Sequence, residues 1–148
     1  MNTNYLRNEA SNLLNEVRAL IERGPGARKA QGDAKYKFED AEQRLGDLQA
    51  FIYTQLMQDK AIDWTHPSPV LDVNGKPVAE YEVQYRTMYA NWLIQQNESF
   101  QALLAERNKA KSDYYEAERE VLGLMENIGV LKTQMALIAA LLRLADEE

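Results

Sequence analysis

The last third of the sequence carries an apolar repeat that constrains the fold more than any other feature. Steps of four and three residues from Leu103 to Leu142 visit twelve positions, and all but Arg107 are apolar or aromatic. A spacing of 3.5 residues held over this length is typical of a helix that packs along its whole length against other helices. The repeat therefore predicts a long, coiled-coil-like C-terminal helix. Its positions are Leu103, Arg107, Ala110, Tyr114, Ala117, Val121, Leu124, Ile128, Leu131, Met135, Ile138 and Leu142.

Apolar residues also recur at helical spacing earlier in the chain, so we expect helices at about 4–23, 33–59 and 77–145. The segment Gly24-Pro25-Gly26 is expected to end the first helix, because proline lacks a backbone donor and glycine tolerates positive φ. Residues 60–76 are expected to form a loop packed on the helices. The expected sites of a bend in the last helix are Asn97, Gly123 and residues 127–129.

These elements predict an all-α fold. It is an elongated helical hairpin or three-helix bundle, built as a single helical domain over residues 1–148. A hydrophobic content of 45% argues against intrinsic disorder.

The far end of the last helix predicts an interface. The first two predicted helices span only about 30 Å and 40 Å, so neither easily covers that end, which is the most apolar part of the chain. Soluble proteins rarely expose a surface of this kind. We therefore expect a homo-oligomer or a complex with a larger protein, with the interface at Val121, Leu124, Ile128, Leu131, Met135, Ile138 and Leu142.

Two further features bear on that interface. Flanking apolar residues make the stripe wider than the seam of a two-stranded coil; they are Leu122, Met125, Leu137, Ala139 and Leu141. Arg107 interrupts the seam. It either sets the register of an assembly or packs its stem while the charged head stays in water.

The charge distribution leaves a second interpretation open. A net charge of −6 disfavours a dedicated nucleic-acid binder, but residues 23–37 are locally basic. They are predicted to form a turn whose basic side chains are candidates for phosphate contact: Arg23, Arg28, Lys29, Lys35 and Lys37. The alternatives to a scaffold, adaptor or inhibitor acting through protein contacts are thus a nucleic-acid-associated accessory factor and an acidic inhibitor of a nucleic-acid-binding protein.

The chain shows no motif for catalysis, cofactor binding or metal binding. It has no cysteine and one histidine, His66, which leaves too few ligands for a thiolate or histidine metal cluster. Glu39 and Glu42 share a helical face, but no Glu-x-x-Asp pair follows on a later helix, so a solvated face is the favoured interpretation. The longest uncharged run near the C-terminus, Thr133 to Leu142, is about half a membrane span. We expect a cytoplasmic, non-enzymatic protein that does not enter a membrane.

Overall fold

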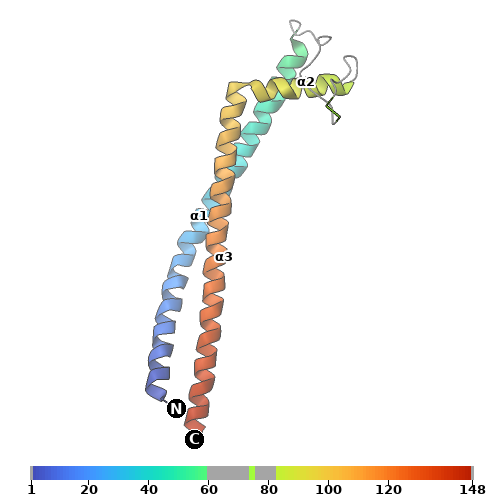
Figure 1. The fold of residues 1–148 in the computed structure, drawn as a ribbon. Coiled ribbons are helices and arrows are strands. Elements are labelled where there is room, and N and C mark those ends of the chain that lie inside the picture. The colour runs from blue at the N-terminus through green and yellow to red at the C-terminus, as the bar shows by residue number, and fades with distance from the viewer. Residues whose placement is uncertain (1, 60–73, 76–82, 148) are drawn as a thin grey trace. The chain divides into compact units, whose positions relative to one another are not determined.

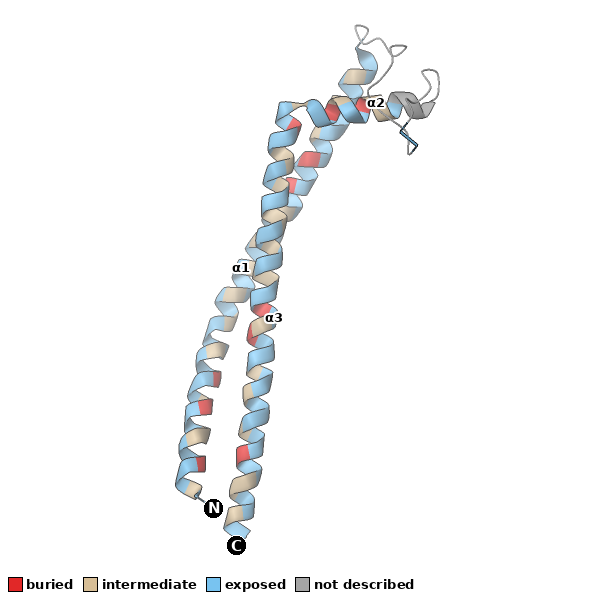
Figure 2. Ribbon diagram, viewed as in Figure 1, coloured by how far each residue is buried: buried red, intermediate tan, exposed pale blue. Residues whose placement is uncertain are grey.

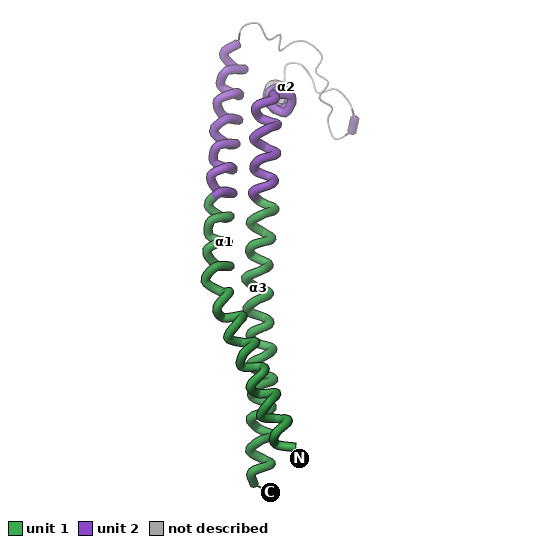
Figure 3. Tube along the Cα trace, turned by 90° about the vertical axis from the view of Figure 1, so that its left-hand side faces the viewer, with its two compact units in different colours: residues 1–36, 111–148 green, residues 37–110 purple. Residues whose placement is uncertain are grey.

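The computed structural model describes residues 2–59, 74–75 and 83–147. Over these ranges the chain forms three helices and no strand: α1 (Thr3–Gln58), α2 (Val83–Gln96) and α3 (Glu98–Glu147) (Figure 1). The two long helices, α1 and α3, pack against each other as a hairpin, and this confirms the predicted all-α fold. Their contacts divide the chain into two units, residues 1–36 with 111–148 and residues 37–110 (Figure 3).

The predicted end of a helix at Gly24-Pro25-Gly26 is wrong, because α1 continues through it and Pro25 lies inside the helix. The two helices predicted at 4–23 and 33–59 are therefore one helix. Relative to alanine, the three residues cost a helix roughly 5 kcal/mol. Packing offsets this cost, because the apolar repeat does not lose phase there. The positions on the side facing α3 are all buried or half-buried: Leu13, Val17, Leu20, Gly24, Ala27, Gln31 and Ala34.

The predicted helix over 77–145 is divided at Asn97, one of the expected bend sites. The Asn97 N–H donates to the carbonyl oxygen of Ile94 at 3.0 Å and closes α2. The Asn97 Oδ1 accepts a hydrogen bond from the Phe100 N–H at 2.9 Å, so the same residue caps the start of α3. At the other two expected bend sites, Gly123 and residues 127–129, α3 is uninterrupted.

The start predicted for the last helix, at residue 77, lies outside the described residues. Most of the loop predicted over 60–76 does too. Within that loop the structure describes only a turn at Asn74-Gly75, where glycine adopts a φ of 76°.

In the unit of residues 1–36 and 111–148, the N-terminal part of α1 packs against the C-terminal part of α3. Leu6, Leu13 and Ile138 form a buried cluster, against which further apolar side chains pack: Ala10, Leu131, Met135, Leu141 and Leu142. Figure 2 shows the buried positions of the two helices on the sides that face each other. Neither helix is covered on its outward side by any other described part of this unit.

In the unit of residues 37–110, α2 joins the two long helices. Leu45 from α1, Ile94 from α2 and Phe100 from α3 form the buried cluster. Partly buried residues complete it: Leu48, Ile52, Leu56, Leu103 and Leu104. This part of α1 therefore has a third element to pack against.

Candidate functional site

The predicted interface residues lie against α1 of the same chain. Val121, Leu124 and Ile138 are buried. The remaining four are half-buried: Ile128, Leu131, Met135 and Leu142. Because α1 does not end at residue 23, the premise that no helix covers the far end of the last helix is wrong. A role for these residues in contacts between chains stays a prediction. We call the seven residues the inner stripe.

A second apolar stripe runs along α3 on the opposite side, and sequence reasoning did not separate it from the first. It consists of residues seven or eight positions apart, which we call the outer stripe: Tyr115, Leu122, Val130, Leu137 and Leu144. Steps of seven or eight residues return to one face of an α-helix, and at 100° per residue this face lies opposite the inner stripe.

The burial of the two stripes agrees with this geometry. Exposed fractions along the outer stripe range from 47% at Tyr115 to 61% at Leu137, whereas Leu124 of the inner stripe is 6% exposed. The outer stripe therefore has no cover from the described chain, and Arg119 and Glu126 lie on the same face between its members. Leu122 and Leu137 were among the flanking residues that made the predicted stripe too wide, and that excess width was the signal for a second face.

A cavity lies between the helices at Gly24-Pro25, with a volume of about 470 Å³. Its walls are apolar on both sides, and Arg28 is the one charged residue that lines it. The lining residues are Ile21, Gly24, Pro25, Ala27 and Arg28 from α1, and Val121, Leu124, Met125 and Ile128 from α3. A Cβ atom built on Gly24 would meet nothing within 4 Å. The packing of the described residues therefore does not require glycine here.

The basic residues predicted to form a phosphate-binding turn lie on α1 instead, because the turn does not exist. Arg23 pairs with Glu120 of α3 at 3.8 Å, and both side chains are more than half exposed. Lys29 lies one residue beyond Arg28, so the two side chains point about 100° apart around the helix. Arg28 and Lys35, seven residues apart, lie on one face of α1, and contact of these basic residues with phosphate stays a prediction.

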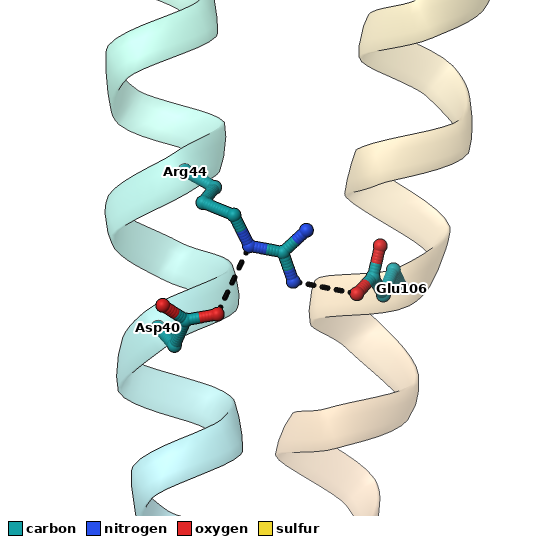
Figure 4. Close-up of polar contacts among 3 residues, drawn as sticks. All are labelled: Asp40, Arg44 and Glu106. Carbon is teal, nitrogen blue, oxygen red and sulfur yellow. Dashed lines mark hydrogen bonds and ion pairs between the residues drawn. The ribbon is translucent and has the colours of Figure 1, made fainter.

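An ion pair connects α1 and α3 within the unit of residues 37–110 (Figure 4). The Arg44 Nη2 donates to the Glu106 Oε1 at 2.6 Å, and its Nε donates to the Asp40 Oδ2 at 3.0 Å. The hydrogen bond to Glu106 is the main cause that raises the pKa of Arg44, so the guanidinium stays charged at any pH of practical interest. The group is well exposed, so we assign it an orienting role, with little effect on stability.

Arg107, the charged residue on the predicted seam, is half-buried, and its Nε is buried without a hydrogen-bond partner among the described residues. Glu106, the residue before Arg107, accepts a hydrogen bond from Arg44 of the same chain. Arg44 is therefore the basic residue that engages Glu106, and this cross-helix pairing could not be identified from the repeat.

Comparison with known protein families, with curated proteins and with solved structures finds no match. Across residues 2–59, 74–75 and 83–147, no group of three or more His, Asp or Glu side chains could hold a metal ion. His66 lies outside these ranges. By length and composition alone, α3 is apolar enough to cross a membrane. The two apolar stripes account for that composition, since together they make both faces of the helix hydrophobic.

Proposed function

We propose that this chain is a non-enzymatic interaction protein whose α3 helix binds another protein through the outer stripe. The observation that carries the proposal is the exposure of five large apolar side chains in a line on one helix face. Surfaces of this kind on soluble proteins commonly mark sites of protein contact. An amphipathic partner helix laid along the stripe would cover it by the same packing that joins α1 to α3.

The free energy available from burying the outer stripe is modest. Fully burying a Leu, Val or Tyr-sized side chain contributes about 1.5–3 kcal/mol, so covering a half-exposed one contributes roughly 1 kcal/mol. The five side chains of the outer stripe then supply roughly 5 kcal/mol, and the stripe of the partner helix supplies a similar amount. Association itself costs about 4–15 kcal/mol. The balance favours a reversible complex over a permanent one.

The nucleic-acid alternatives receive less support from the geometry. The basic residues of 23–37 are distributed around a helix, and Arg23 is engaged with Glu120. An acidic inhibitor would act through charged faces of α1 and α3, and such faces occur on most exposed helices. We therefore place the site on the outer stripe and expect the protein to act in the cytoplasm.

Site-specific photo-crosslinking in the source cells tests the proposal. A photoreactive phenylalanine analogue replaces Leu137 of the outer stripe in one variant and Glu22, an exposed polar residue of α1, in a matched control. We expect protein adducts from position 137 and few from position 22. Equal adduct formation at the two positions, or none at 137, would refute a partner site on the outer stripe.

A further inference from the structure

The outer stripe is arranged symmetrically along the helix, and this symmetry identifies a partner. Its midpoint falls at Gly129-Val130. Leu122 and Leu137 are equally far from this midpoint in sequence, and so are Tyr115 and Leu144. A surface with such internal symmetry matches itself when a second copy is turned by a two-fold rotation, as in most homodimers.

We propose that the partner of the outer stripe is a second copy of this chain, whose α3 packs antiparallel about Gly129-Val130. This inference rests on the proposed function and names the partner of the same site. Leu122 then faces Leu137 of the second copy, and Tyr115 faces its Leu144. Four of the five side chains of the stripe thus meet another large apolar side chain.

The centre of the stripe allows the two helices to approach closely. Gly129 is exposed, and a Cβ atom built on it would meet nothing within 4 Å. It lines a shallow groove on α3 together with Glu126, Val130, Thr133 and Gln134. In the antiparallel pair, Val130 of one copy lies level with Gly129 of the other along the helix, because the two-fold axis passes between these residues.

The charges beside the stripe favour the antiparallel sense. Lys111, Glu118, Arg143 and Glu147 lie on one flank of the stripe, given the helical repeat of 3.6 residues. Turning one copy about the midpoint brings Lys111 near Glu147 of the second copy, and Arg143 near its Glu118. A parallel two-fold pair would instead place this flank on opposite sides of the interface in the two copies, so neither pairing could form.

The length of the stripe sets the strength of the dimer. From Tyr115 to Leu144 it spans about 45 Å of helix. A helix pair of that length with axes about 9 Å apart covers roughly 400 Å² of each copy, about half the usual area per partner in a stable complex. The small area predicts a reversible dimer that dissociates on dilution.

Sedimentation equilibrium of the full chain, from about 1 to 500 µM, tests the inference. We expect monomer at the low end and dimer at the high end. Leu137→Glu should raise the Kd at least about tenfold, because each copy then buries a charge against an apolar side chain. Phe51→Glu is the matched control, since Phe51 and Leu137 are both 61% exposed and Phe51 lies off the stripe. Circular dichroism establishes that both variants are folded.

Charge reversal tests the antiparallel sense. Arg143→Glu should weaken the dimer about threefold or more, and adding Glu118→Arg should restore it. A dimer that Leu137→Glu leaves intact, or a charge reversal without rescue, would overturn the proposed arrangement.

A chain that stays monomeric at the highest concentration would overturn the second copy as partner. The proposed function would still stand if position 137 gave crosslinks to a different protein in cells, and it would fall with the inference if position 137 gave none.

Discussion

Replacing Pro25 by alanine should stabilise the protein, although proline substitutions of this kind are usually neutral or harmful in loops. Pro25 lies inside α1 and has no N–H to donate to the carbonyl oxygen of Ile21, one helical turn earlier. Alanine restores this donor and removes a helix-interior penalty of about 3 kcal/mol. Loss of the proline also gives the unfolded chain more freedom, which offsets roughly 0.5–1 kcal/mol. The net gain is roughly 2 kcal/mol.

The two glycines that flank Pro25 can be replaced by alanine in the same experiment. A Cβ atom built on Gly24 or Gly26 would meet nothing within 4 Å, so alanine fits at both positions without a clash. Each substitution should add roughly 0.5–1 kcal/mol, because glycine loses more backbone freedom on folding than alanine does. The triple variant Gly24→Ala, Pro25→Ala and Gly26→Ala should therefore be about 4 kcal/mol more stable than the natural chain.

Urea and thermal unfolding followed by circular dichroism at 222 nm measure these changes. A chain of this size should show a rise in Tm of about 2–4 °C per kcal/mol. Gly46→Ala, at an open helical position in the other unit, is a control for the general effect of removing a glycine. If the chain instead turned at Gly24-Pro25-Gly26, alanine would remove the positive-φ residues that the turn needs. A fall in stability for the triple variant would thus refute a continuous α1.

Four other substitutions have expected outcomes that unfolding measurements can check. Asn97→Ala should cost about 1 kcal/mol of stability by removing the cap of α3, and a stability equal to that of the natural chain would argue against the corner between α2 and α3. Ile138→Ala should cost roughly 2–4 kcal/mol, since it empties a buried site. At sub-micromolar concentration, Leu137→Ala should change the free energy of unfolding by less than about 0.5 kcal/mol. Equal effects of Leu137→Ala and Ile138→Ala would contradict the assignment of the two faces of α3. Arg44→Met should lower the Tm at low salt, and the difference should disappear in about 1 M NaCl if the pair with Glu106 is its cause.

The fold class follows from the apolar repeats, whereas the helix boundary at residues 24–26 does not follow from local preference. Gly24-Pro25-Gly26 has the strongest local signal for a helix end in the chain. Yet Leu20, Gly24, Ala27 and Ala34 continue the repeat of α1 in phase on both sides of Pro25. The contacts that α1 makes with α3 outweigh the local cost. The repeat keeps its phase across residues 24–26, and this continuity is visible in the sequence. It predicts a single helix better than the helix preferences of the individual residues do.

Which face of α3 is the candidate site depends on whether the first helix ends at residues 24–26. A first helix that ended at residue 23 would leave the inner stripe uncovered, and the sequence then predicts an interface there. Once α1 extends to Gln58, the inner stripe is the contact between the two long helices and the outer stripe is the surface left exposed. Leu122 and Leu137 appear in the sequence as excess apolar residues, but their separate role requires knowing which face α1 occupies. The Arg44–Glu106 pair likewise depends on the alignment of two helices, which no local pattern specifies.

A cysteine crosslink tests most directly whether α1 covers the inner stripe of its own chain and leaves the outer stripe to a partner. The natural chain contains no cysteine, so Ala10→Cys with Met135→Cys introduces a single pair, and both residues pack on the cluster of Leu6, Leu13 and Ile138. On mild oxidation of dilute protein, we expect an intramolecular disulfide, seen as a monomer of altered mobility that reduction reverses. A disulfide-linked dimer in place of the intramolecular disulfide would show that the inner stripe joins two chains, and would contradict the account.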